Sequence, residues 1–164
     1  MTLIEIEWKG PFSIEEVTSL NSDTDYGIYQ IYGTHNILGT DVLLYVGQAC
    51  EQTFGTRLPQ RDYITWDFPE YRIYIGRLGA AKVATMQDWN EKINFAEQIL
   101  IDYCQPPYNS HLINGLSAGI ANDINILNFG KRHKLPFAIT TSWRLSSHNA
   151  GQWKPYSNKM YSSQ

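Results

Sequence analysis

Two apolar runs of strand length, joined by a turn-rich linker, place the strongest constraint on how this chain can fold. The runs are YGIYQIY at residues 26–32 and DVLLYVG at residues 41–47. Between them lies the turn-rich segment GTHNILGT, so the pattern predicts a β-hairpin with a long loop. Alternation along a strand predicts Tyr29 and Tyr32 on opposite faces of the first strand. It likewise predicts Leu43, Tyr45 and Gly47 on one face of the second, and the register between the two strands is left open.

Helix signals occur at two places. The run SIEE at residues 13–16 has the form of a capping box and predicts a short helix at about 14–20. Asp88 and Glu91 stand in the same relation and predict a second helix, which continues to Cys104 and is stopped by two prolines. The apolar residues of this second helix leave little polar face, so we expect it to be buried on most sides.

The rest of the chain is described by one more strand and two irregular segments. YRIYIGRL at residues 71–78 alternates β-forming residues and predicts a third strand. Residues 48–63 are polar and interrupted by Gly55 and Pro59, which predicts a loop with a short, irregular helix. A chain of 164 residues is the size of one domain that can bury its own core.

Charge is divided unevenly along the chain. Residues 1–110 carry seven Lys and Arg against fifteen Asp and Glu, a net −8, whereas residues 111–164 carry six against one, a net +5. The densest basic cluster is Lys131, Arg132 and Lys134. Such a cluster would suit phosphates, although an uneven distribution of ordinary surface charge explains it equally well.

Several classes of protein are not indicated. The acidic N-terminus lacks a basic leader, and no run of eighteen apolar residues occurs, so we expect neither export nor membrane insertion, and a cytoplasmic protein. The two cysteines and four histidines show no zinc-ligand spacing. No GxxxxGK[ST] phosphate loop is present, so ATP dependence is not suggested.

Glu97 raises a question of solvation, because it shares helix positions with Ile93, Leu100 and Ile101. A carboxylate there would need a cation, a metal or hydrogen-bond donors to compensate for lost water. An ion pair with an arginine is the plainer explanation. The alternative is Mg²⁺, which often takes only one or two protein carboxylates and completes its shell with water and substrate phosphates.

The order of these features resembles the GIY-YIG nuclease family. The matching residues, in order, are Gly27-Ile28-Tyr29, Tyr45-Val46-Gly47, Arg57, Glu97 and Asn109. The resemblance implies an α+β fold, in which a small three-stranded antiparallel sheet is flanked by helices. It divides the chain into an N-terminal extension with a short helix (1–24), a nuclease-like core (25–110) and a basic, loop-rich C-terminal segment packed on the core (111–164).

The resemblance also implies roles. Tyr29 would accept or relay a proton from the attacking water, and Tyr45 would bind or orient the scissile phosphate. Arg57 would stabilise the transition state, Glu97 would hold a divalent metal, Mg²⁺ or Mn²⁺, and Asn109 would brace the site by hydrogen bonds.

Each role has a structural alternative. The tyrosines are equally interpretable as core residues, Arg57 as a surface ion-pairing residue and Asn109 as a turn residue. The family often places a histidine or tyrosine one turn after the arginine, and Arg61 stands there instead, as a possible auxiliary residue.

The resulting hypothesis is a metal-dependent endonuclease that hydrolyses phosphodiester bonds of double-stranded DNA. Loose similarities in TRLPQR and TSWRL indicate a restriction-type enzyme, which would work as a homodimer on a symmetric site. Lys131, Arg132, Lys134 and Arg144 would then contact phosphates. Two alternatives remain: a repair or mobile-element nuclease of the same family, and a catalytically inactive module that binds nucleic acid or serves a structural role.

Overall fold

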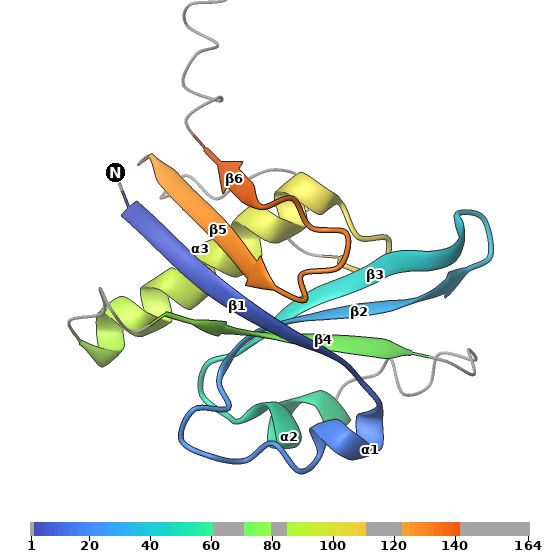
Figure 1. Cartoon of the computed structure of the whole chain (residues 1–164), viewed down its shortest axis with the longest axis horizontal. Coiled ribbons are helices and arrows are strands. Elements are labelled where there is room, and N and C mark those ends of the chain that lie inside the picture. The colour runs from blue at the N-terminus through green and yellow to red at the C-terminus, as the bar shows by residue number, and fades with distance from the viewer. Residues whose placement is uncertain (1, 61–70, 80–84, 111–122, 142–164) are drawn as a thin grey trace, which may run out of the picture.

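The computed structural model of the chain is shown in Figure 1 and describes residues 2–60, 71–79, 85–110 and 123–141. The elements, in order, are β1 (Thr2–Phe12), α1 (Ile14–Val17), β2 (Gly27–His35), β3 (Gly39–Ala49), α2 (Phe54–Arg57), the 3₁₀ turn η1 (Leu58–Gln60), β4 (Arg72–Leu78), α3 (Met86–Cys104), β5 (Ile124–Gly130) and β6 (Ala138–Thr140).

The strands form one curled, six-stranded mixed sheet in the order β3-β2-β4-β1-β5-β6 (Figure 1). The predicted fold, a small three-stranded antiparallel sheet flanked by helices, is therefore wrong. β2 pairs antiparallel with both β3 and β4, but β4 continues to β1, and β1 pairs in parallel with β5. The additional strands come from the two ends of the chain, for which only a short helix and loops were expected.

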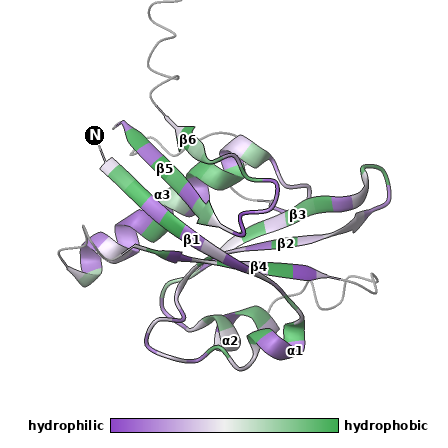
Figure 2. Ribbon diagram, in the orientation of Figure 1, coloured by the Kyte–Doolittle hydropathy of each residue, from purple (hydrophilic) through white to green (hydrophobic). Residues whose placement is uncertain are grey.

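β1 owes its central place to strict alternation in its sequence. Ile4, Ile6 and Trp8 are buried, while Glu7 between the last two and Lys9 after Trp8 are exposed. The ribbon coloured by hydropathy shows this alternation along β1 and again along β5 (Figure 2). Period-two alternation is the signature of a strand with one buried face, so β1 carried a readable signal.

The predicted hairpin of β2 and β3 is confirmed, with Tyr29 opposite Gly47 and Ile31 opposite Tyr45. The register then shifts, so that Tyr32 pairs with Leu43. This irregularity adds a residue to β3 and moves Leu43 to the opposite face from Tyr45, contrary to the simple alternation expected.

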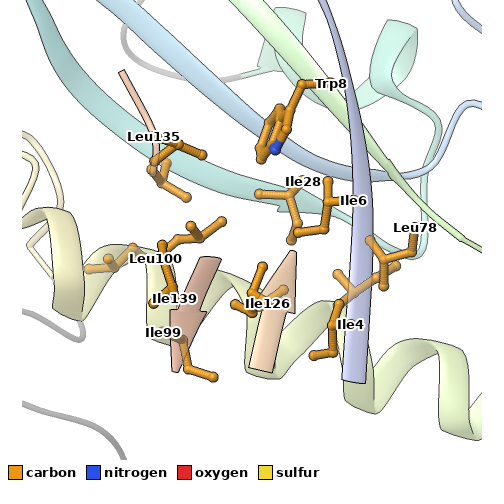
Figure 3. Close-up of a cluster of buried hydrophobic side chains, with 14 of the residues drawn as sticks. Ile4, Ile6, Trp8, Ile28, Leu78, Ile99, Leu100, Ile126, Leu135 and Ile139 are labelled. Carbon is orange, nitrogen blue, oxygen red and sulfur yellow. The ribbon is translucent and has the colours of Figure 1, made fainter. Parts of the chain in front are cut away.

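Two hydrophobic cores lie on opposite faces of the sheet. The α3-side core packs strands against α3 and is mainly aliphatic (Figure 3); it contains Ile4, Ile6, Trp8, Ile28, Tyr32, Val46, Tyr74, Leu78, Ile93, Ala96, Ile99, Leu100, Ile101, Ile124, Ile126, Leu135 and Ile139. The α2-side core lies under α1 and α2 and contains Val17, Tyr29, Ile31, Ala49, Phe54, Leu58, Ile73 and Ile75. Tyr29 and Tyr32 thus face opposite ways, as predicted.

The helices agree with their sequence signals in part. The capping box before α1 is confirmed, because Ser13 Oγ accepts from Glu16 N and Glu16 Oε2 accepts from Ser13 N. α3 begins earlier than predicted, and its N-cap is Thr85, whose Oγ1 accepts from Asp88 N. Within the described residues, no helix is both long enough and apolar enough to span a membrane.

Candidate active site

Tyr29 and Tyr45 lie side by side on the α2-side face of the hairpin. Their ring centroids are 6.1 Å apart and the ring planes are inclined by 27°. Tyr29 is fully buried at 0% exposure, whereas Tyr45 is half-buried at the edge of the α2-side core. Of the two side chains, Tyr45 is therefore the one accessible to a substrate.

Gly47 makes room for both rings. It stands opposite Tyr29 in the sheet and two residues beyond Tyr45 on the same strand. A Cβ at this position would lie 2.5 Å from Tyr29 Oη and 2.7 Å from Tyr45 Cε1. Both distances are too short for any real contact, so this packing of the tyrosines requires glycine.

Asn109 binds the outer edge of β3 at Val46, between Tyr45 and Gly47. Its Nδ2 donates to Val46 O at 2.8 Å, and Val46 N donates to its Oδ1 at 3.0 Å. β3 is an edge strand, so these groups have no neighbouring strand to pair with, and the buried carboxamide takes that place. Asn109 thereby holds the strand at the point where Tyr45 and Gly47 flank Val46.

Arg57 is the last residue of α2 and is half-buried. Its helix neighbours Phe54 and Leu58 are fully buried in the same core as Tyr29. The predicted short helix at this place is confirmed, and it sets Arg57 at the border of the α2-side core.

Glu97 is half-buried on α3 rather than enclosed, contrary to the deep burial expected from its helix position. It acts electrostatically at the end of β3: burial raises the pKa of the Cys50 thiol, and the negative charges of Glu51 and Glu97 raise it further. Cys50 follows directly after β3. The structure thus joins Tyr29, Tyr45 and Asn109 around residues 45–47, with Arg57 at the border of the same core. It does not bring Glu97 into this group, because α3 packs on the opposite face of the sheet.

The basic cluster is largely occupied by contacts within the chain. His133 Nε2 lies 2.8 Å from Asp41 Oδ1, and Lys134 Nζ lies 3.1 Å from Asp41 Oδ2. Arg132 donates to the carbonyl of Leu135. The grouping of Lys131, Arg132 and Lys134 as a dedicated phosphate-binding patch is weakened by these contacts.

Asp41 is a charged residue that the sequence did not single out. Burial alone would raise its pKa, but hydrogen bonds from His133 and Lys134 and the charge of Arg72, 2.5 Å away, hold that pKa below its usual range. The 92-residue separation of Asp41 and His133 leaves no local sequence signal for this pairing. Two other predicted residues, Arg61 and Arg144, lie outside the described residues.

The donor set available to a metal is small. Within the described ranges, no group of three or more His, Cys, Asp or Glu side chains is placed to hold a metal ion. A half-buried single carboxylate such as Glu97 fits only a hard cation that takes most of its ligands from water and substrate, as Mg²⁺ does.

Comparison with known proteins adds no relative. Searches against models of protein families, against curated proteins and against solved structures each found no match.

Proposed function

We propose that this protein is a metal-dependent endonuclease that hydrolyses phosphodiester bonds in double-stranded DNA. The supporting observation is the arrangement of Tyr29, Tyr45 and Gly47, in which two tyrosines pack on a glycine that nothing larger can replace. A further support is Asn109, which brackets Val46 with two hydrogen bonds.

The burial of the two tyrosines assigns them different parts. Tyr45 is half-buried and would bind the scissile phosphate through its hydroxyl. Tyr29 is enclosed, so it would act as a positioning residue that supports the Tyr45 ring, in place of the direct proton transfer implied by the resemblance. A phenol with a pKa near 10 is in any case a poor base at neutral pH.

Arg57 and Glu97 would supply the charges. Arg57 carries a permanent, planar cation that suits the extra negative charge of a phosphoryl transition state. Glu97 would hold Mg²⁺ or Mn²⁺, and such an ion, when bound, polarises the phosphate. Asn109 would keep the strand that carries Tyr45 fixed relative to these groups.

The proposal extends to a restriction-type enzyme acting in the cytoplasm as a homodimer. A symmetric duplex has two strands to cut, and a two-fold dimer offers one site to each. A repair or mobile-element nuclease would use the same residues on a different substrate. Cleavage of a defined palindromic site would distinguish a restriction-type enzyme from these two.

The test is cleavage of supercoiled plasmid by Glu97→Gln in the presence of Mg²⁺. We expect a loss of about a hundredfold or more, because the variant removes the only proposed metal-binding charge. Glu91→Gln is the matched control, since Glu91 is an exposed glutamate on the same helix and the charge change is identical. Equal cleavage rates for the two variants would contradict the proposed role of Glu97.

The full burial of Tyr29 favours one alternative function, a module that binds nucleic acid or has a structural role without catalysis. Its signature is a gel shift that persists while plasmid stays intact across Mg²⁺ and Mn²⁺. Any metal-dependent cleavage that Glu97→Gln abolishes decides against this alternative.

A further inference from the structure

A pocket of about 1000 Å³ opens beside the first turn of α3, between it and the ends of β2, β3 and β4. Its apolar wall is formed by Tyr26, Leu78, Met86 and Trp89. This volume is at the upper end of the range of sites that take small organic molecules. Neither the predicted nuclease residues nor the two cores account for it.

The described lining of the pocket includes two exposed carboxylates, Asp23 and Glu51. Its neutral polar side chains, such as those of Thr24, Thr85 and Asn90, can donate as well as accept. The two carboxylates are therefore the groups that would select a charged ligand, and they would attract a cation.

Among the described residues of the lining, the cationic side chain is Arg77, and it is already paired. Arg77 donates through Nη2 to Asp25 and through Nε to the carbonyl of Thr24 at 3.0 Å. Its guanidinium also lies 5.9 Å from the centre of the Phe54 ring. With Arg77 neutralised by the buried Asp25, the described part of the lining keeps the negative charges of Asp23 and Glu51.

We propose that this pocket binds a small organic cation, an amine carried on an apolar or aromatic body. The carboxylates would attract the ammonium group, and the rings of Tyr26 and Trp89 would pack on the body and the charge. The inference rests on this pocket alone and stands whether or not the chain is a nuclease.

Cys50 provides a local reporter of occupancy, because its half-buried thiol lines the pocket. The raised pKa of this thiol, caused by burial and by Glu51 and Glu97, agrees with a negative potential at the site. The other free thiol, Cys104, has a pKa of about 12 because of burial, and Cys104→Ser removes it as a competing target.

The experiment measures protection of Cys50 from iodoacetamide in the Cys104→Ser chain at mildly alkaline pH. The probes are tryptamine, tryptophol and indole-3-acetate, which share an indole body and carry an ammonium, a hydroxyl and a carboxylate. We expect millimolar tryptamine to protect Cys50, tryptophol to protect at least about fivefold less well, and indole-3-acetate not to protect.

Variants test the residues. Glu51→Gln is expected to weaken tryptamine protection by about fivefold, while Glu15→Gln, at an exposed glutamate on α1, leaves it unchanged. Trp89→Leu is expected to weaken it by about tenfold, with folding monitored by circular dichroism. Equal protection by tryptamine and tryptophol, stronger protection by indole-3-acetate, or no protection by any probe would each overturn the proposal.

Discussion

The two faces of the sheet are built differently. On one face, the 19-residue helix α3 packs against aliphatic side chains from most of the strands, and the buried Trp8 Nε1 donates to Asn128 Oδ1 at 2.9 Å. On the other, two helices of four residues each cover a smaller core that contains the Tyr29–Tyr45 pair. The α3-side core is the broader of the two, whereas on the thinly covered α2-side face one hairpin tyrosine, Tyr45, is only half-buried.

The largest effect is expected from Trp8→Ala on the α3-side face. Trp8 is 1% exposed, and its ring packs directly over Gly76. Removing it should lower the free energy of unfolding by about 3–5 kcal/mol, since a large cavity remains and Asn128 loses its donor. Urea denaturation measures this change. Ile37→Ala, at a residue 87% exposed in the hairpin loop, is the control, and its change should stay within about 0.5 kcal/mol.

A smaller loss of stability is expected on the opposite face from Gly47→Ala. The new methyl group would meet both tyrosine rings at under 3 Å, so the rings must move. Overpacking of this kind costs about 1–3 kcal/mol, and plasmid cleavage should fall as well because Tyr45 is displaced. At Gly79, a Cβ meets nothing nearer than 3.5 Å, so Gly79→Ala should change neither quantity. Matching results for the two variants would contradict the packing described here.

Local sequence signals predicted individual elements well. Ser13 and Glu16 marked α1, the alternation of YRIYIGRL marked β4, and the GIY and YVG runs marked a hairpin. These signals involve residues close together in the chain, where hydrogen bonding and side-chain alternation act directly. The β1–β5 pairing joins residues more than 120 positions apart, and no local pattern specifies a partner at that distance.

The candidate site shows the same division. Tyr29 and Tyr45 could be placed on neighbouring strands from the sequence, but Tyr29 is buried in a core that also takes Phe54 from α2 and Leu58 from η1. The half-burial of Glu97 depends on how α3 is set against the sheet, which helix periodicity does not determine. The contacts of His133 and Lys134 with Asp41 turn a basic run in the sequence into a set of internal ion pairs.

Acidification tests both faces, because Asp25 and Asp41 are carboxylates with a lowered pKa that form ion pairs on different sides of the sheet. For Asp25 and Asp41 alike, burial opposes ionisation, but hydrogen bonds and cations prevail, from Arg77 and Ser22 at Asp25 and from His133, Lys134 and Arg72 at Asp41. A depressed folded-state pKa stabilises the protein above the unfolded value, near 3.9, and this stabilisation is lost as the pH falls through the folded value.

At neutral pH, Asp25→Asn should therefore lower the free energy of unfolding by about 1–2 kcal/mol, because the Asp25 side chain is only 7% exposed. Asp41→Asn should lower it by less than about 1 kcal/mol, because the Asp41 side chain is 31% exposed. Urea unfolding across the acid range measures both. The cost of each variant should shrink as the pH falls below the normal range of aspartate. A cost that stays constant with pH would contradict the lowered pKa values.

Removal of single hydroxyl groups is expected to give the smallest change in stability. It should also distinguish most clearly between a residue needed for stability and one needed for cleavage. Tyr32 lies in the α3-side core, and its Oη donates to the buried Gln30 Oε1 at 2.8 Å. Tyr32→Phe should cost about 1 kcal/mol and leave plasmid cleavage unchanged, because the buried Tyr32 hydroxyl is not one of the proposed site groups. Tyr45→Phe keeps the ring beside Tyr29 and should cost less than about 0.5 kcal/mol, yet reduce cleavage by about a hundredfold.

Measured together, the two variants separate stability from activity. Tyr32→Phe should lower mainly the stability, and Tyr45→Phe should lower mainly the rate of cleavage. Tyr32 and Tyr45 are matched as tyrosines of one hairpin that differ in the face on which they lie. If Tyr45→Phe cleaves as fast as the unaltered protein, its hydroxyl does not contact the phosphate. The stacked pair of Tyr29 and Tyr45 then belongs to the core alone, and both faces of the sheet serve stability.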